Sequence, residues 1–282
     1  MRRLVVTADD AGLHPGMTLG VARAFDRGIV TAVSVAAVGR AFDHAVEVLR
    51  ERPGLDAGVH LALVGERPLS PPSEIPSLVG GDGAFLPGFP AFAARYARGG
   101  IARAEVRAEL GRQVERLVAT GLPVLHLNSH QHLHALPGVF ETVLDLAAEH
   151  RIPWVRIPRA RGALRRPSFR GVQLAVLDTL GRQAGRRLEA RRRQGDSARG
   201  IRTLGIFDAG HVTLDRLGRS LAAADPDGVA ELVCHPGLDG PALAADYDWD
   251  YDWEEETAAL CDPAAEALLE SQGFELTSFS LL

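Results

Sequence analysis

Short apolar runs rich in β-branched residues alternate with amphipathic stretches along nearly the whole chain of 282 residues. The runs that we read as strands are residues 4–8, 31–38, 58–63, 124–127, 154–157, 203–207, 231–234 and 274–279. Residues 17–27, 42–50, 101–119, 139–150 and 262–272 repeat their apolar positions with helical spacing. This alternation predicts an α/β fold, a (β/α) barrel like the TIM barrel but of irregular build, with parallel strands and outer helices. Its active site is expected at the carboxyl ends of the strands.

The composition fits a single domain over residues 1–282, because 46% hydrophobic and 24% charged residues allow a full core at this length. Two segments depart from the regular pattern. Residues 66–90 are rich in Pro and Gly, as in a long lid or binding loop. Residues 159–202 are rich in arginine and are expected to form an insertion.

The net charge of −5 argues against nucleic-acid binding, which needs a basic face. All 31 basic residues are arginine, and the arginine-rich segment reads most simply as a solvated surface. The alternative is a surface that attracts an anionic substrate group or gives peripheral membrane contact.

Cysteine use and hydropathy predict a cytoplasmic protein without a transmembrane segment. Cys234 and Cys261 form neither a disulfide framework nor a CxxC pair. The first apolar run is too short for a signal peptide, and no run approaches the ~18 apolar residues of a membrane span. A homodimer is compatible with these features.

Asp9 and Asp10 close the first apolar run. Neighbouring residues on a strand point to opposite faces, so the two carboxylates can share a cavity only where the strand turns into its loop, and Gly12 permits such a turn. Two close carboxylates stay ionised together if a cation binds one of them. The alternative is a pair of N-caps for the next helix.

Histidines stand at the ends of other runs. His60 alone could be a hydrogen-bonded core residue. The segment 126–134 is more informative, because His130, His132 and His134 share a face in a strand, and the first and last of them do in a helix. Either geometry lets two imidazoles converge on a metal ion.

A further run ends in Cys234, His235 and a Pro-Gly pair, a sharp exit that would hold an imidazole at the rim of the barrel. Cys234 reads as core packing. His211 is a weaker candidate of the same kind. One Asp and two His around a divalent ion leave positions for water and substrate, as in hydrolytic zinc sites.

Five motifs occur in order: TADDAGLHPGMTLGVARAFDRGIVTAVS, GVHLALVGERPL, LNSHQHLHALPGVF, ELVCHPG and QGFELTSF. They resemble the YdjC-like carbohydrate deacetylases, the family that includes chitooligosaccharide deacetylase. The resemblance implies a hydrolase that uses one divalent metal ion, Mg²⁺ or Zn²⁺, to remove the N-acetyl group from an amino sugar. Its substrate would be an N-acetylglucosamine-containing oligosaccharide or glycolipid.

Carried over by position, the resemblance implies metal ligands, catalytic groups and supporting residues. The metal ligands are Asp10, His60 and His130; the proton acceptor is Asp9, the catalytic histidine is His235, and the supporting or substrate residues are Asn128, His132, His134 and His211. Within the family, residues 128–134 and 210–213 look most like the hopanoid-biosynthesis-associated branch. Two departures are Ala11, where the family usually has Phe, and Asn128, where it often has a charged Asp that orients a ligand histidine.

Two other readings remain open. Another barrel metallohydrolase, an amidohydrolase or a phosphoesterase, would also use HxH segments, although a phosphoesterase usually needs a second metal and more carboxylates. From a different class, the chain could be a catalytically silent sugar-binding module.

Overall fold

The barrel predicted from the strand and helix alternation is confirmed by the computed structural model, which describes residues 2–160, 169–225 and 228–282. Seven parallel strands close a ring: β1 (Arg2–Ala11), β2 (Ala32–Val35), β3 (Asp56–Leu61), β4 (Val124–Ser129), β5 (Trp154–Ile157), β6 (Arg199–Leu204) and β7 (Val229–Cys234). The ring closes because β1 pairs with both β7 and β2. An eighth strand, β8 (Phe274–Thr277), pairs with the first residues of β1.

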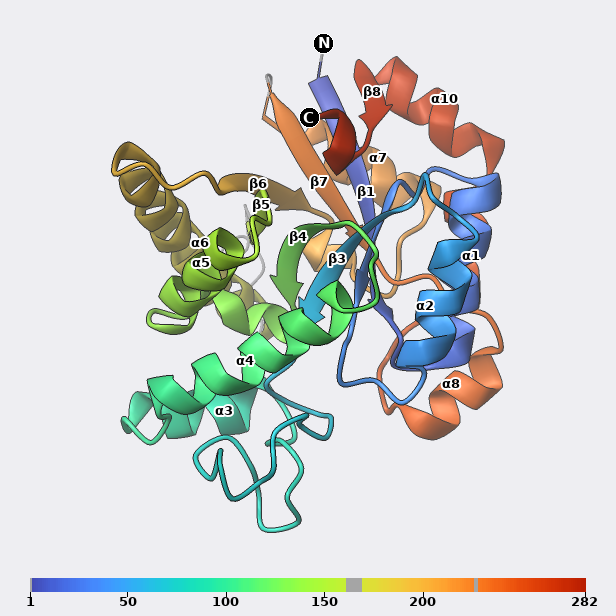
Figure 1. Ribbon diagram of the computed structural model, residues 1–282. Coiled ribbons are helices and arrows are strands. Elements are labelled where there is room, and N and C mark those ends of the chain that lie inside the picture. The colour runs from blue at the N-terminus through green and yellow to red at the C-terminus, as the bar shows by residue number, and fades with distance from the viewer. Residues whose placement is uncertain (1, 161–168, 226–227) are drawn as a thin grey trace.

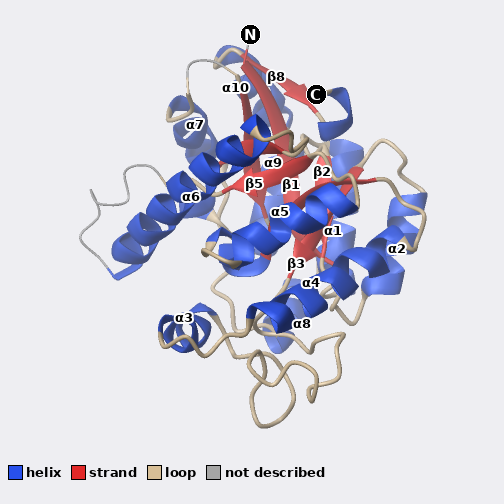
Figure 2. Ribbon diagram, turned by 60° about the vertical axis from the view of Figure 1, so that its left-hand side comes forward, coloured by secondary structure: helices blue, strands red, loops and turns tan. Residues whose placement is uncertain are grey.

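Helices surround the strands, as Figure 2 shows. They are α1 (Pro15–Arg27), α2 (Phe42–Arg50), α3 (Phe89–Ala97), α4 (Arg103–Val118), α5 (Val139–Glu149), α6 (Phe169–Arg193), α7 (Leu214–Ala222), α8 (Gly240–Asp246), α9 (Trp253–Cys261) and α10 (Pro263–Ser271). The amphipathic spacing seen in the sequence is their buried face; α2, for example, buries Phe42, Val46 and Leu49. Among the described helices, none is both long and apolar enough to cross a membrane.

The two ends of the barrel differ in what covers them. In Figure 1 the arrowheads of β3 and β4 point toward α3, α8 and the long connection between β3 and α3, whereas both chain termini lie at the other end. That connection contains the Pro- and Gly-rich residues 66–90 and touches itself through isolated bridges such as Val79 to Phe85. The polar residues at the carboxyl ends of the strands therefore lie at the same end of the barrel as this loop.

The predicted strand at residues 203–207 is wrong in its bounds. The strand β6 begins at Arg199 and ends at Leu204, and a short 3-10 helix, η3 (Ile206–Asp208), follows it. Arg199 and Arg202 are exposed, while Ile201 is buried. The prediction relied on an uninterrupted apolar run, whereas β6 is only partly buried and includes the exposed residues Arg199 and Arg202.

The arginine-rich segment includes α6, which connects β5 to β6, and its residues 161–168 lie outside the described part of the chain. Two of its arginines reach carboxylates of α5: Arg187 lies 3.2 Å from Glu141 and Arg191 lies 2.9 Å from Asp145. Such exposed pairs contribute little stability individually. They do neutralise part of the positive charge that the sequence places here.

A neutral histidine is buried in the interior of the barrel. His126 of β4 stacks on Phe279 with ring centroids 4.4 Å apart, and neither of its ring nitrogens has a hydrogen-bond partner. On the neighbouring strand, a Cβ at Gly58 would lie 2.4 Å from this ring, so glycine provides the space for it. Burial lowers the pKa of His126 to about 3.

We predict that His126→Phe weakens the acid sensitivity of folding. An unfolded histidine titrates near 6.5 and the folded one near 3, so acidification through this window favours the unfolded state. The loss is up to about 1.4 kcal/mol per pH unit from this group. Denaturant titrations at pH 7 and pH 5 measure the free energy of unfolding of both proteins. The His126→Phe variant should lose less stability between these pH values, because phenylalanine cannot be protonated. Equal losses in the wild type and the variant would contradict the conclusion that His126 is buried in its neutral form.

Candidate metal centre and active site

The last residues of β1 bring two adjacent carboxylates to one place. Asp10 has a positive φ of 67°, a conformation that aspartate tolerates, and the register between β1 and β2 shifts between Ala8 and Ala11. As a result both carboxylates reach the ring of His60: Asp9 Oδ1 is 3.9 Å from its Nδ1, and Asp10 Oδ1 is 3.1 Å from its Nε2. The turn expected at the end of this strand is present, and it occurs at Asp10 itself.

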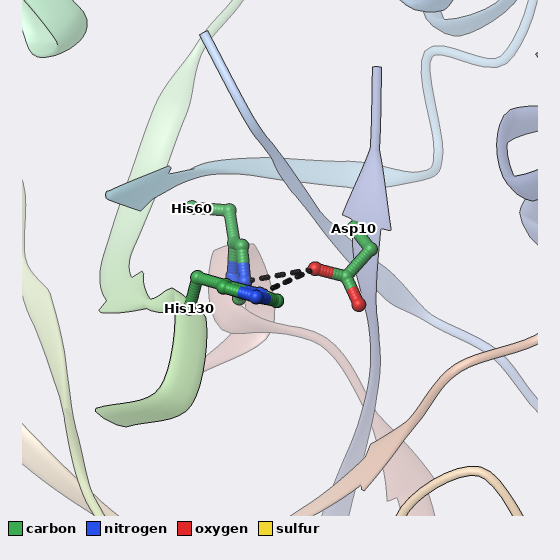
Figure 3. Close-up of side chains that lie close together, drawn as sticks. All are labelled: Asp10, His60 and His130. Atoms are coloured by element: carbon green, nitrogen blue, oxygen red, sulfur yellow. Dashed lines mark hydrogen bonds and ion pairs between the residues drawn. The ribbon is translucent and has the colours of Figure 1, made fainter. Parts of the chain in front are cut away.

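Asp10, His60 and His130 form a cluster of potential metal ligands, drawn in Figure 3. His60 comes from β3, and His130 follows directly after β4. Asp10 Oδ1 lies 3.2 Å from His130 Nδ1, and one ligand atom of each residue lies within 4.8 Å of the other two. In the described part of the chain, this is the one group of three such side chains close enough to share an ion.

The cluster fits a cation by its chemistry. His60 Nε2 is buried without a hydrogen-bond partner although it faces Asp10. Burial alone would lower the pKa of His60, but Asp9 and Asp10 raise it; burial would raise the pKa of Asp10, but the neighbouring imidazoles of His130 and His60 bring it well below its ordinary value. The raised pKa of His60 reflects the negative charge of the two aspartates, and Asp10 stays ionised, so a divalent ion could bind between these groups in place of a proton.

Asn128 sets which nitrogen of His60 faces the cluster. Its amide nitrogen donates to Asp9 Oδ1 at 2.9 Å and to Ser34 Oγ at 2.9 Å. Because an ionised carboxylate only accepts hydrogen bonds, the amide oxygen must face His60, where it lies 2.8 Å from Nδ1. That nitrogen therefore carries the proton, and the lone pair of Nε2 points at the cluster, as in a metal ligand.

A buried ion-pair network keeps Asp9 charged. Arg156 of β5 donates to Asp9 Oδ2 at 2.5 Å and Oδ1 at 2.9 Å, and to both oxygens of Glu231 at 2.9 and 2.8 Å. All three side chains are at most 2% exposed. Burial would raise the pKa of Asp9, but the charge of Arg156 dominates and holds it far below its ordinary value. The network joins β1, β5 and β7 across the interior.

His235 follows β7 and faces the same cavity, with Nε2 4.0 Å from Asp10 Oδ2. Its backbone N–H donates to Glu256 of α9 at 2.5 Å, and the other oxygen of Glu256 accepts from the backbone of Val212 at 3.1 Å. One glutamate thus fixes the loops after β6 and β7. Burial lowers the pKa of His235, so this imidazole is neutral at neutral pH.

The expectation that two imidazoles of the segment 126–134 converge on one metal ion is wrong. The chain turns after β4 into a 3-10 helix, η1 (His130–Ala135), in which Gln131 and His132 have positive φ. His134 points away from the cluster, with Nδ1 2.7 Å from Ser129 Oγ and Nε2 3.0 Å from the carbonyl oxygen of Arg156. His132 is half-buried beside it, with ring centroids 6.3 Å apart. Of these three histidines, only His130 belongs to the cluster.

Several residues of the site were missed by the sequence reading. Arg156 and Glu231 are charged residues inside apolar strands, a signal that they pair with each other or with the site. The segment Tyr247-Asp248-Trp249-Asp250-Tyr251-Asp252 was overlooked although its alternation of aromatic and acidic residues is unusual. Its Trp249 ring lies 5.2 Å from the ring of His130 between centroids.

The chain matches the family model described as YdjC-like protein over residues 3–271. It is 30% identical to a carbohydrate deacetylase of Geobacillus stearothermophilus, with 99% of this chain and 97% of that protein aligned. A chitooligosaccharide deacetylase of Yersinia enterocolitica is 28% identical, with 98% of each chain aligned. A solved structure from Enterococcus faecalis V583, described as a cellobiose-phosphate cleavage protein, superposes with a TM-score of 0.77 at 22% identity over 99% of this chain and 98% of that one, a likeness of fold alone.

We predict that Asn128→Leu weakens metal binding. Leucine removes the acceptor that fixes the proton on His60 Nδ1, so the ligand nitrogen is no longer preset, and the affinity for Zn²⁺ should fall about 10–100-fold. Ser34→Ala is the matched control, because it removes a hydroxyl that donates to Asp9 at 2.5 Å and lies 3.3 Å from His60 Nδ1, but it leaves the closer Asn128 acceptor at 2.8 Å in place. Competition with a chelating dye measures the Zn²⁺ affinity of both variants. Unchanged affinity in Asn128→Leu would refute the proposed orientation.

Proposed function

The chain belongs to the YdjC-like family, and on that basis we propose that it is a carbohydrate deacetylase that hydrolyses the N-acetyl group of an amino sugar to acetate and a free amine. The observation that carries the proposal is the cluster of Asp10, His60 and His130 at the carboxyl ends of the strands. Barrel enzymes place their chemistry at this end. The names of the relatives support a sugar amide as the bond attacked.

We assign the role of metal ligands to Asp10, His60 and His130. Two imidazole nitrogens and one carboxylate suit Zn²⁺ or a similar transition ion, whereas Mg²⁺ prefers oxygen ligands. A divalent ion held there would polarise the carbonyl of the acetamide and lower the pKa of an attacking water molecule. The proton transfers are assigned to side chains around the cluster.

Asp9 is the proposed proton acceptor for the attacking water. Arg156 keeps it ionised, so its accepting form is present throughout the neutral pH range. The same ion pair makes Asp9 a weak base, so it holds a proton only briefly. Its Oδ2 accepts a hydrogen bond from Arg156, whereas Oδ1 accepts from Arg156, Ser34 and Asn128, which leaves Oδ2 the more open of the two.

His235 is the proposed proton donor to the leaving amine. His60 and His130 contact Oδ1 of Asp10, whereas Nε2 of His235 lies 4.0 Å from the other oxygen, Oδ2. Because burial lowers its pKa, His235 is neutral before the reaction; it would take up the proton that Asp9 accepts from the attacking water and, as a stronger acid than a free imidazolium, pass it to the leaving amine. The backbone contact with Glu256 holds His235 in place for this transfer.

A phosphoesterase is the less favoured alternative. Such enzymes commonly hold two metal ions through several carboxylates. Over residues 2–160, 169–225 and 228–282 a single three-residue cluster was found, and it contains one carboxylate. The carboxylate of Asp9 is paired with Arg156 and is not a member of this cluster. A silent sugar-binding module would bind sugar without releasing acetate.

We predict that the purified protein, loaded with Zn²⁺, Co²⁺, Mn²⁺ or Mg²⁺, releases acetate from N-acetylglucosamine oligosaccharides or from a lipid-linked N-acetylglucosamine. Enzyme-coupled detection of acetate, with the metal-stripped protein as a control, measures this activity. Phosphate release from sugar phosphates without acetate release would favour the phosphoesterase. Sugar binding with neither product would identify a binding module.

We predict different defects for the two neighbouring aspartates. Asp10→Asn should weaken metal binding, because a neutral amide replaces a charged ligand. Asp9→Asn should retain the metal and lower turnover about 10²–10⁴-fold, while Glu231 remains as a partner for Arg156. Metal titration and acetate release at saturating metal separate these effects. Metal loss confined to Asp9→Asn would reverse the assignments.

A further inference from the structure

Residues 247–252 run without helix or strand between α8 and α9 and alternate two kinds of side chain. Tyr247, Trp249 and Tyr251 are partly buried, whereas the aspartates between them are exposed. The three rings contact one another in order and are less exposed than the aspartates between them, so they lie on the same, inner side of the segment. We call these three residues the aromatic strip.

The aromatic strip runs from one proposed functional histidine, His130, to another, His235. The ring centroid of Trp249 lies 5.2 Å from that of His130, with planes 30° apart. The ring of Tyr251 lies 5.1 Å from that of His235. Trp249 contacts both neighbours, at 4.7 Å from Tyr247 and 5.5 Å from Tyr251. A ligand that enters beside His130 and reaches the metal cluster would lie against the ring of Trp249.

Both ends of the strip are fixed. The Tyr247 hydroxyl donates to the carbonyl oxygen of Leu13 at 3.2 Å. At the other end the Asp252 backbone N–H donates to Gly210 at 2.8 Å, and its carboxylate lies 2.8 Å from His211 Nδ1. A Cβ at Gly210 would lie 2.1 Å from the Tyr251 ring, so this glycine leaves space for the ring. A surface held in this way binds with little loss of conformational entropy.

A cleft of about 340 Å³ opens beside the strip. Tyr247, Trp249 and His130 line it together with charged residues. Among its described lining residues, the guanidinium of Arg40 is paired with Asp246, and the carboxylates of Glu66 and Asp248 add negative charge. Such a lining disfavours an anionic ligand and leaves the ring faces as the main contact surface.

We propose that the aromatic strip, and Trp249 above all, is a stacking platform for an uncharged pyranose ring next to the acetamide that is hydrolysed. The C–H groups on one face of a pyranose carry partial positive charge, and they pack on the negatively polarised face of an aromatic ring. The ligand is a neutral N-acetylated oligosaccharide rather than a phosphorylated sugar. This inference rests on the proposed deacetylation for the position of the acetamide.

Kinetics with N,N′-diacetylchitobiose and the metal-loaded enzyme provide the first test. Trp249→Ala should raise KM about tenfold and change kcat much less, because stacking holds the substrate but takes no part in proton transfer. Trp249→Phe, which keeps a ring, should recover most of the loss. Metal content, measured for each variant, separates lost stacking from disturbance of His130. A wild-type KM in a metal-containing Trp249→Ala enzyme would overturn the proposal.

Intrinsic fluorescence provides a test that does not depend on turnover. The chain has three tryptophans; Trp253 is buried, and Trp154 packs near Phe279, 6.0 Å away between centroids. Adding the disaccharide should change the emission of the wild type and of Trp154→Phe immediately, before hydrolysis, but not that of Trp249→Phe. A change that persists in Trp249→Phe, or none in the wild type, would overturn the platform. If this change is seen without any acetate release, the proposed function fails and the platform stands.

Discussion

The ion pair between Arg156 and Asp9 determines the chemistry of the whole interior. Isolated buried charges are costly, and they are found with partners and hydrogen bonds. Arg156 lies between Asp9 and Glu231 and satisfies both. Once Asp9 is held as an anion, it can only accept hydrogen bonds, so the amide nitrogen of Asn128 must face it. The orientation of His60 follows, and with it the lone pair directed at Asp10.

The backbone at the end of β1 separates two carboxylates that are neighbours in sequence. The positive φ of Asp10 brings its side chain to the cavity that Asp9 already faces. One carboxylate then neutralises Arg156, and the other is left for His60 and His130. A regular strand would have placed one of the two on the outer face. Identical side chains thus acquire different surroundings from a single backbone torsion.

The positions of the barrel and of most candidate residues could be predicted from the sequence, because both follow from local patterns. A buried parallel strand is an apolar run, and a polar residue at its end lies at the carboxyl-end rim of the barrel, as Asp10 and His60 do. The bounds of β6 could not be found in this way, since exposed Arg199 and Arg202 interrupt the run. The torsions that turn the chain after His130 also leave no simple trace in the sequence.

Interactions between residues far apart in the sequence could not be predicted either. Arg156 and Glu231 are 75 positions apart, and each alone resembles a surface charge within a strand. Their pairing becomes visible only when the ring closes. Asn128 is instructive as well, because the loss of a charged residue there suggested a weaker hold on a ligand histidine. Its amide makes that contact without charge, and it donates to Asp9, which a second carboxylate could not do while ionised.

X-ray absorption spectroscopy of the zinc-loaded protein tests the central claim most directly, because it counts the ligand types around the ion. The account predicts two imidazole nitrogens and a carboxylate oxygen, with light-atom ligands completing the shell, and the loss of one imidazole in His60→Ala. A sulfur ligand, a third imidazole from His134 or His235, or a spectrum unchanged by His60→Ala would contradict it.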